Sequence, residues 1–312
     1  MITLQQMTYI LAVADMGQFQ KASEFCNVTQ PTLSMQVKKA EDMLGHRIFD
    51  RSLSTIQLTS FGEQLIPVLR DVISENMKVS QLLKRHSGKG EEVLRVGVIP
   101  TIARYLVPVI FEGNVKSDFV FGCHFVEGYT SDLIVKLQKR ELDLVIAAGP
   151  YVQPGYTSVK LYDEELNVYL PDAFSRSDEK IIPVKVLQSL RPWLLSEGNC
   201  LRSQMISFCK MKDEDVLTKW DYNGGNLEVL MHIVGQEGGY TIIPEYYPVA
   251  DPGHIFSVDI TDSGHYPGRS VIAVHHSRAV NTNLFNELIH FIQHSFSRSS
   301  AKPLNIIGWT GE

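Results

Sequence analysis

The chain has 312 residues, 44% of them hydrophobic and 21% charged, which exceeds one ordinary folding unit and predicts two or three domains with sizeable apolar cores. Its formal net charge of −6 argues against a uniformly basic coat for binding nucleic acid but leaves room for local patches. Residues 1–87 carry nine basic and eight acidic side chains, a net charge of +1, whereas the rest carry 20 basic and 27 acidic ones, a net charge of −7.

The termini and cysteines narrow the class of protein further. The N-terminus has no basic segment followed by a cleavage site, and no apolar run reaches transmembrane length, so we expect a cytoplasmic protein without a membrane partner. The cysteines are too few for a disulfide scaffold and form no C-x-x-C pair, and the histidines lack metal-ligand spacing. We therefore expect no metal and no cofactor. The four cysteines are Cys26, Cys123, Cys200 and Cys209.

A helix-turn-helix is predicted near the N-terminus. Apolar residues recur at helical spacing over 3–15, and a second short helix covers 18–26. Thr29 is a suitable N-cap for a third helix, which has Pro31 in its first turn and ends at Gly45. The second and third helices, joined by a short turn, have the helix-turn-helix pattern.

The outward face of the third helix and the segment after it suit a DNA duplex. Glutamine and threonine can bond base edges in the major groove, whereas lysine and arginine mainly contact phosphates. Two short β-like runs within 47–59 predict a wing. An all-helical packing domain without a nucleic-acid role is the alternative. The predicted DNA-binding residues are Gln30, Pro31, Thr32, Ser34, Gln36, Lys38, Lys39 and Arg51.

Several stretches in the first 65 residues resemble the N-terminal signature of LysR-type transcriptional regulators. They are Ala22, Val28–Ser34, Leu44-Gly45, Phe49-Asp50-Arg51 and Leu58–Gly62. The resemblance implies a winged helix-turn-helix domain over 1–59 that binds double-stranded promoter DNA, assembly into a homodimer or homotetramer, and contact with RNA polymerase. Met35 stands where many members carry arginine.

A long amphipathic helix is predicted from Ser60 to about His86. Ser60 and Glu63 have the spacing of a capping box, and the apolar stripe is too long for one local core. The resemblance makes 60–90 a linker helix and hinge that pairs two subunits; an ordinary buried helix is the alternative.

Beyond residue 91 the pattern predicts an α/β effector domain. Strand-like runs at 93–99, 119–126 and 142–148 alternate with helical stretches, which gives a βαβ rhythm and an open sheet. A second lobe is expected over about 165–267, after which the chain returns to the first. Two lobes within 91–300 form the architecture of periplasmic-binding-protein-like domains. The segment after Ser297, with a tail at 301–312, is expected to lack order.

Cys200 and Cys209 are nine positions apart in a predicted helix that begins at Cys200. An ideal helix separates them by about 13.5 Å of rise and half a turn, so a disulfide between them requires local remodelling. The helix N-terminus and Arg202 both favour a thiolate at Cys200. A thiolate can attack a peroxide, and the resulting sulfenic acid can condense with a second thiol. Two inert core cysteines are the alternative.

Thr101 and Thr130 follow predicted strands, at the edge of an α/β sheet where ligands bind. They are pocket candidates, with a role as helix N-caps as the alternative.

The segment 195–209, together with 226–230 and 238–244, resembles the redox-active region of peroxide-sensing members of the LysR-type family. The resemblance implies that Cys200 reacts with peroxide, that Cys209 resolves the product, and that Arg202 stabilises the thiolate. It also makes Thr101 and Thr130 pocket residues. Asn199 stands where those members usually have histidine.

The function that this resemblance implies is a redox-sensing regulator rather than an enzyme. Hydrogen peroxide would be the signal, and a reversible Cys200–Cys209 disulfide would switch oxidative-stress gene expression. Two alternatives stay open: a LysR-type regulator that responds to a small metabolite between the lobes, and a thiol peroxidase.

Overall fold

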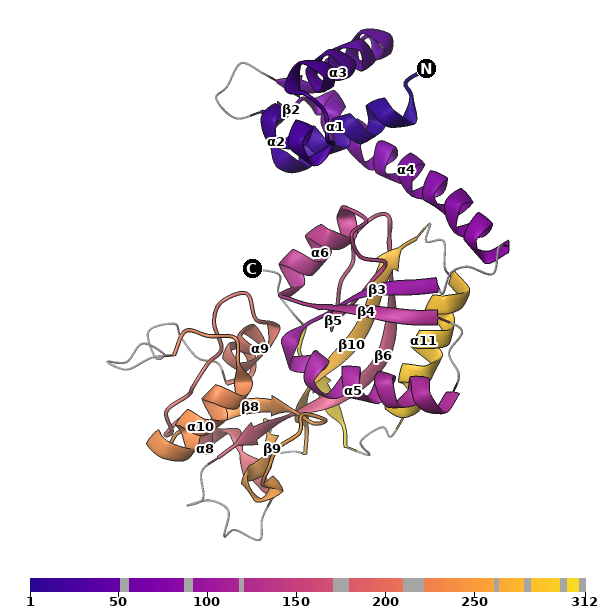
Figure 1. Cartoon of the computed structure of the whole chain (residues 1–312). Coiled ribbons are helices and arrows are strands. Elements are labelled where there is room, and N and C mark those ends of the chain that lie inside the picture. Colours follow the sequence, from indigo (N-terminus) through magenta and orange to yellow (C-terminus); the bar gives the residue numbers. More distant parts are fainter. Residues whose placement is uncertain are drawn as a thin grey trace. The chain divides into compact units, whose positions relative to one another are not determined.

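The computed structural model describes residues 1–50, 56–86, 92–117, 121–170, 180–209, 222–260, 264–277, 282–297 and 302–308. The chain divides into two compact units, Met1–Gly90 and Glu91–Glu312 (Figure 1). Among the described helices, none combines the length and the apolar character needed to cross a membrane.

The first unit is a helix-turn-helix followed by a two-stranded wing and a long helix. Thr29 Oγ1 accepts a hydrogen bond from the Thr32 backbone N–H at the start of the third helix, and Gly45 ends that helix with a left-handed φ of 72°. The predicted helices and wing are confirmed, although Arg51 at the wing lies outside the described residues. The elements are α1 (Leu4–Met16), α2 (Phe19–Phe25), α3 (Gln30–Leu44), β1 (Phe49–Asp50), β2 (Gln57–Leu58) and α4 (Ser60–His86).

The long helix α4 begins as predicted, but its cap is a different residue. Thr59 Oγ1 accepts from the Gly62 backbone N–H at 3.0 Å, and Thr59 Oγ1 also donates to the Arg47 carbonyl at 2.7 Å. The capping box predicted for Ser60 and Glu63 is therefore wrong, because the preceding threonine already occupies the capping position. Toward its other end α4 exposes the apolar residues Val72 and Val79.

The first lobe of the second unit is a mostly parallel sheet flanked by helices. Strands β4, β3 and β5 are parallel neighbours, and β10 and β6 continue the sheet in antiparallel register. This arrangement confirms the predicted βαβ rhythm. The elements are β3 (Glu92–Val98), α5 (Pro100–Ser117), β4 (Phe121–Glu127), α6 (Thr130–Gln138), β5 (Leu144–Ala148), β10 (Tyr266–His276) and α11 (Thr282–Ser295).

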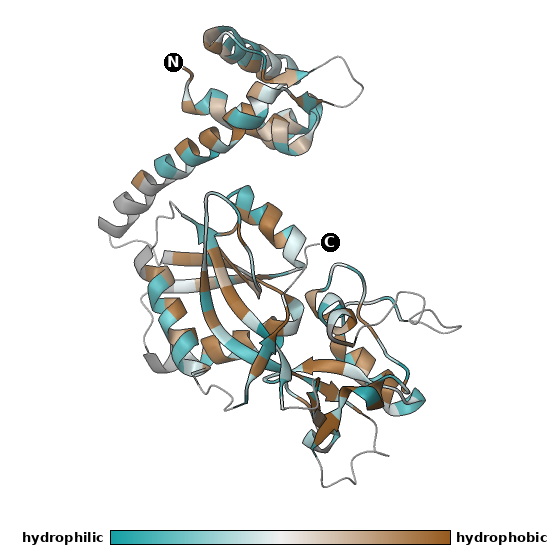
Figure 2. Cartoon of the chain, turned by 180° about the vertical axis from the view of Figure 1, so that it is seen from behind, coloured by the Kyte–Doolittle hydropathy of each residue, from teal (hydrophilic) through white to brown (hydrophobic). Residues whose placement is uncertain are grey.

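The second lobe is built on the far half of one long strand, β6 (Tyr156–Tyr169), which pairs with β10 in the first lobe and with β8 and β9 in the second. Each lobe has its own apolar core, and Figure 2 shows hydrophobic residues concentrated on the strands of both. The other elements are β7 (Ile181–Pro183), α8 (Val184–Leu187), α9 (Cys200–Cys209), α10 (Leu227–Glu237), β8 (Thr241–Pro244), η2 (Pro252–His254) and β9 (Ile255–Asp259).

The C-terminal segment adds a strand to this sheet. β11 (Leu304–Ile306) pairs in parallel with Tyr266–Gly268 of β10, and the Ile307 backbone N–H donates to the Gly268 carbonyl at 2.8 Å. The prediction of an unordered tail is therefore wrong for residues 302–308. The register of β5 covers β10 only from Val271 onward, which leaves backbone groups at the start of β10 open to pairing.

Candidate functional site around Cys200

Cys200 is the first residue of α9, as predicted. Gly198 has a left-handed φ of 81°, and Asn199 Oδ1 accepts a hydrogen bond from the Leu201 backbone N–H at 3.0 Å. Asn199 is therefore the side-chain cap of the helix. This cap fixes the Cys200 sulfur in the first turn, where free backbone N–H groups carry partial positive charge.

The Cys200 thiol is buried between two helix starts. Its side chain is 2% exposed and belongs to the core of the first lobe. Thr130 Oγ1 is hydrogen-bonded to Cys200 Sγ at 3.0 Å, and Thr130 is the first residue of α6. The cap of α6 is Tyr129, and Thr101 lies inside α5. Neither threonine is an N-cap, so the alternative proposed for them is wrong.

Arg269 on β10 completes the surroundings of the thiol. Its guanidinium is fully buried and donates to Thr101 Oγ1 at 3.0 Å and to the Thr101 carbonyl at 3.4 Å. Its positive charge lowers the pKa of Cys200. Arg269 is thus a site residue that was not predicted, and the signal available was an arginine within a strand-like run.

The cation assigned from sequence, Arg202, has a different contact. Its Nη1 donates to the Leu195 carbonyl at 3.1 Å. Side chains two positions apart on a helix point about 200° apart, so a cation two residues after Cys200 faces away from the sulfur. The cation that lowers the pKa of Cys200 is therefore Arg269 and not Arg202, as the sequence had led us to expect.

The thiol itself is protonated at neutral pH. Burial raises the pKa of Cys200, and the hydrogen bond with Thr130, the charge of Arg269 and the backbone N–H of Cys200 only partly oppose that rise. The predicted net preference for a thiolate is therefore wrong for this conformation, because desolvation outweighs the helix N-terminus.

Cys209 ends the same helix in a different environment. It is buried in the core of the second lobe, and Tyr240 donates its hydroxyl proton toward Cys209 Sγ at 3.5 Å. Burial raises the pKa of Cys209 to about 11, partly opposed by Tyr240. Both cysteines are free thiols, and α9 carries one into each lobe.

The middle of α9 is tied to the C-terminal segment. Gln204 is fully buried, and its Nε2 donates to the Ile307 carbonyl at 3.1 Å. A rearrangement of α9 must therefore break a contact with the segment that pairs with β10.

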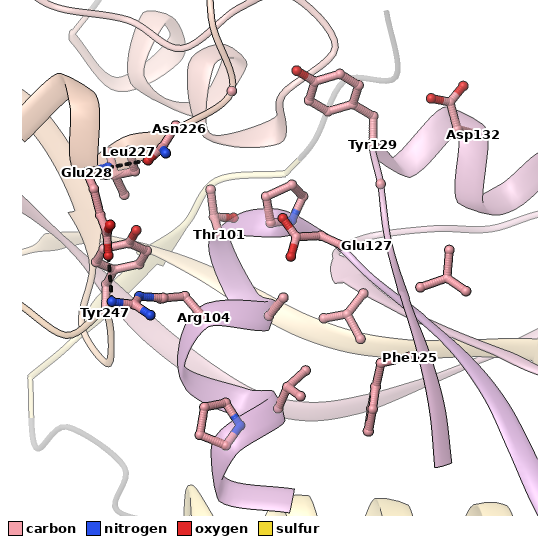
Figure 3. A pocket seen from close by; sticks show the side chains of 18 residues that line it. Thr101, Arg104, Phe125, Glu127, Tyr129, Asp132, Asn226, Leu227, Glu228 and Tyr247 are labelled. Carbon is pink, nitrogen blue, oxygen red and sulfur yellow. Dashed lines mark hydrogen bonds and ion pairs between the residues drawn. The ribbon is translucent and has the colours of Figure 1, made fainter. Parts of the chain in front are cut away.

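The two lobes also line a cavity of about 860 Å³, which is within the range of small-molecule sites. Figure 3 shows Thr101, Glu127 and Tyr129 on one side and the start of α10 on the other. Arg104 and Glu228 form an ion pair of 2.6 Å across it. Thr101 contributes to the lining, whereas Cys200 does not.

The predicted DNA-binding residues of α3 are mostly accessible. Gln30, Pro31, Thr32, Lys38 and Lys39 are exposed, and Ser34 and Gln36 are half-buried. Gln36 Oε1 accepts from Gln6 Nε2 at 3.2 Å, so part of its hydrogen-bonding capacity ties α3 to α1. Met35 is 61% exposed on the same helix, which gives this surface an apolar contact point.

Comparison with known proteins identifies the class. Residues 4–63 match the bacterial regulatory helix-turn-helix protein model of the lysR family, and residues 87–297 match the LysR substrate binding domain. The chain belongs to the LysR family of bacterial transcriptional regulators, which confirms the resemblance seen in its first 65 residues.

Within that family the chain is similar to proteins named for peroxide. It is 27% identical over 243 residues to the Escherichia coli K12 "DNA-binding transcriptional dual regulator OxyR", covering 78% of this chain and 79% of that protein. It is 28% identical over 248 residues to the Haemophilus influenzae "hydrogen peroxide-inducible genes activator", covering 78% and 80%. A structure of full-length OxyR from Pseudomonas aeruginosa matches with a TM-score of 0.67 at 27% identity, covering 94% and 98% of the two chains.

Proposed function

We propose that this chain is a LysR-type transcription regulator that senses hydrogen peroxide through a reversible disulfide between Cys200 and Cys209. The observation that carries the proposal is the contact of Cys200 Sγ with Thr130 Oγ1 at 3.0 Å, beside the buried Arg269. The second thiol lies at the far end of the same helix. The peroxide-related names of the relatives support the same signal.

The chemistry uses one peroxide and two thiols. Cys200, once deprotonated, attacks one peroxide oxygen; an S–O bond forms, the O–O bond breaks, and the departing hydroxide takes a proton to become water. The Cys200 sulfur is oxidised to sulfenic acid by this two-electron step. The Cys209 sulfur then attacks it, the S–O bond breaks, and a second water leaves as the S–S bond forms. Thr130 and Arg269 are the groups available to bind the peroxide oxygens and stabilise developing negative charge.

The signal is the rearrangement that the disulfide demands. Bonded cysteines need Cα atoms about 4.4 to 6.8 Å apart, whereas the ends of a ten-residue helix are about 13.5 Å apart in rise. Oxidation must therefore unwind α9 and withdraw side chains from both lobe cores. The second unit would change shape and, through 60–90, alter the spacing of paired DNA-binding domains.

Membership of the family supports a proposal for the regulatory assembly. We propose a winged helix-turn-helix over 1–59, a pairing helix and hinge over 60–90, an effector domain over 91–300 with its second lobe at about 165–267, and a short tail over 301–312. The partners would be promoter DNA, further copies of this chain in a dimer or tetramer, and RNA polymerase, in the cytoplasm. DNA contact would come from the exposed residues of α3 together with Arg51.

Disulfide mapping of the full-length reduced protein tests the sensor. After one equivalent of peroxide, we expect mass spectrometry to find Cys200 joined to Cys209, with Cys26 and Cys123 still reduced. Equal oxidation of all four cysteines, or no Cys200–Cys209 bridge, would contradict the proposal.

The DNA contact is tested by salt dependence. Replacing Lys38 or Lys39 with alanine should weaken binding to all DNA sequences alike. The logarithm of affinity should also fall less steeply with the logarithm of salt concentration, by the amount expected for the loss of about one phosphate contact. Binding that is insensitive to salt in the unsubstituted protein would contradict phosphate contact by this surface.

A second candidate function is a response to a small metabolite, which the cavity of about 860 Å³ favours. Peroxide would then leave the DNA footprint unchanged, whereas a metabolite would shift it in the Cys200→Ser variant as well. A thiol peroxidase is tested by turnover: consumption of more than one peroxide per subunit, with a thiol reductant present and at a rate matching that of peroxidases, would support it.

A further inference from the structure

The C-terminal residues 302–308 lie where the chain crosses between the two lobes. β11 pairs in parallel with Tyr266–Gly268, where β10 returns from the second lobe to the first. On the neighbouring strand, β6 passes from one lobe to the other just after Glu165. A buried ion pair of 2.8 Å between Arg269 and Glu164 joins the two strands beside this crossing. We call residues 302–308 the C-terminal strap.

Lys302 anchors the beginning of the strap to the crossing. Its Nζ donates to Glu165 Oε2 at 2.9 Å and to Ser257 Oγ of β9 at 2.6 Å. The same Nζ lies 4.9 Å from the centre of the Tyr266 ring. Because the Glu165 carboxylate is buried, this contact is less screened by salt than an ion pair on the surface.

The middle of the strap packs closely on β10. A Cβ atom added at Gly268 would lie 3.1 Å from both Cβ and Cδ1 of Leu304, so glycine at this position allows the strap to approach. The Tyr266 backbone N–H also donates to the Pro303 carbonyl at 3.1 Å. The position of the strap on the strand is therefore fixed by both backbone bonds and packing.

The end of the strap reaches the helix that carries both redox cysteines. The Ile307 side chain is buried in the core of the second lobe, which also contains Met205 and Cys209 of α9. Its carbonyl accepts the bond from Gln204 Nε2 at 3.1 Å, and Gln204 is fully buried. A buried amide that loses its partner is costly, so the helical form of α9 and the docked strap stabilise each other.

We propose that the C-terminal strap is a clamp on α9: by joining the middle of that helix to the lobe crossing, it opposes the unwinding that a Cys200–Cys209 disulfide requires. The inference rests on the proposed peroxide-sensing function. It adds a segment outside the thiol site that sets how readily oxidised Cys200 reaches Cys209.

The strap is suited to loosening without unfolding of the lobes. Pro303, Asn305 and Ile306 are exposed, and Ile307 is the buried side chain among the described strap residues. Segments with few buried side chains open at a lower free energy than the core strands. A change at either end of the strap should therefore be felt at the other end.

Lys302→Met tests the clamp in the reduced protein, because it removes one anchor without altering α9 or either cysteine. Coupling between two sites is reciprocal, so a strap loosened at Lys302 should hold Gln204 less firmly. We expect the amide hydrogens of Cys200–Cys209 to exchange several-fold faster with deuterium, while those of β5 in the first lobe keep their rate. Hydrogen exchange with peptide mass spectrometry on the full-length chain measures both.

Arg95→Met is the matched control. It removes a cation of similar exposure, 43% for Arg95 against 40% for Lys302, whose partner Asp143 belongs to the first lobe. Exchange in α9 should not change in this variant. Unchanged α9 exchange in Lys302→Met, or equal acceleration in Arg95→Met, would overturn the proposal.

Two truncated chains give a second comparison. A chain that ends at Lys302 lacks the rest of the strap, whereas a chain that ends at Gly308 keeps all of it. We expect α9 to exchange faster in the first chain than in the second, and equal exchange would overturn the clamp. If the shorter chain fails to fold, Lys302→Met still decides.

Oxidation separates the clamp from the sensor. In Lys302→Met, peroxide should oxidise Cys200 at the unchanged rate, after which the disulfide with Cys209 should form several-fold faster, as followed by quenched mass spectrometry. A disulfide step that is unchanged or slower would overturn the clamp. Absence of the disulfide in the unsubstituted protein would instead refute the peroxide-sensing function, and the exchange measurements on reduced protein would still judge the clamp.

Discussion

The two ends of α9 give its two cysteines contrasting surroundings. At the first residue, Cys200 has the Thr130 hydroxyl, the helix N-terminus and the charge of Arg269. At the last residue, Cys209 has the apolar core of the second lobe and one weak hydrogen bond from Tyr240. At the first end three groups favour negative charge on the sulfur, whereas at the second end Tyr240 alone does so. The contrast therefore supports the attacking role proposed for Cys200 and the resolving role proposed for Cys209.

The largest effects should come from the cysteines themselves. Cys200→Ser should abolish oxidation by stoichiometric peroxide, because the sulfur proposed to attack peroxide is lost. Cys209→Ser should still form a sulfenic acid at Cys200 but no intramolecular disulfide. Trapping of sulfenic acid followed by mass spectrometry distinguishes the two. Sulfenic acid at Cys209 in the Cys200→Ser variant would reverse the assignment.

The next effect should come from the hydroxyls that face each sulfur. Thr130→Val keeps the shape of the side chain but removes a hydrogen bond to a charge-bearing atom, about 1.5–3 kcal/mol. We expect oxidation of Cys200 to slow by roughly 10- to 100-fold, measured by stopped-flow mixing with peroxide. Thr130→Ser should restore most of the rate.

Tyr240→Phe is the matched change at the other end of α9. It should leave the first oxidation step nearly unchanged, because Tyr240 contacts the Cys209 sulfur. Equal slowing of that step by Thr130→Val and Tyr240→Phe would remove the distinction between the two ends.

A smaller effect is expected in the alkaline stability of the protein. The pKa of Cys209 rises from its ordinary 9.0 to about 11, so the folded chain keeps a proton that the unfolded chain releases. The stabilisation is complete below the lower value and is lost as pH rises through the upper one. We expect the free energy of unfolding to fall less steeply over this window in Cys209→Ala, by on the order of 2 kcal/mol. Urea unfolding at a series of pH values measures it.

Cys200→Ala is the control for the alkaline effect, since three groups oppose the burial of Cys200. The dependence of the free energy of unfolding on pH should change less in Cys200→Ala than in Cys209→Ala. A larger change in Cys200→Ala than in Cys209→Ala would contradict the description of Cys209 as the cysteine whose burial is less opposed.

The smallest effect should come from the middle of α9. Gln204→Met keeps the length of the side chain but removes the bond to the Ile307 carbonyl. The helical conformation of α9 in the reduced protein should lose about 1 kcal/mol of stability. The disulfide should therefore form several-fold faster after the first oxidation, which quenched mass spectrometry can follow. A slower step would mean that this contact assists the rearrangement instead of resisting it.

The local features of the fold could be predicted from the sequence. Thr29 and Gly45 delimit α3 because capping and left-handed residues act within one turn. Gly198 and Asn199 placed the start of α9 at Cys200 for the same reason. The family resemblance implied that Cys200 and Cys209 are redox partners. Their spacing alone showed that a disulfide between them would require the helix to be remodelled.

Contacts between residues far apart in the chain could not be predicted from the sequence. Thr130 and Cys200 are 70 positions apart, and Arg269 reaches Thr101 across 168 positions; no local pattern encodes such pairs. Arg202 was expected to act on the Cys200 sulfur because it is close in the sequence, but its position on the helix directs its side chain away from that sulfur. The tail became a strand because β10 offers an unpaired edge there, which only the assembled sheet reveals.

The sequence by itself determined where each helix starts, which thiols share a helix and which family the N-terminal segment resembles, because these depend on neighbours within a few residues. Tertiary structure decided which cation acts on Cys200, which carboxylate compensates that cation, and which lobe buries each sulfur. Those choices depend on strand register, and the pairing of Arg269 with Glu164 across β10 and β6 exists only once the two strands meet.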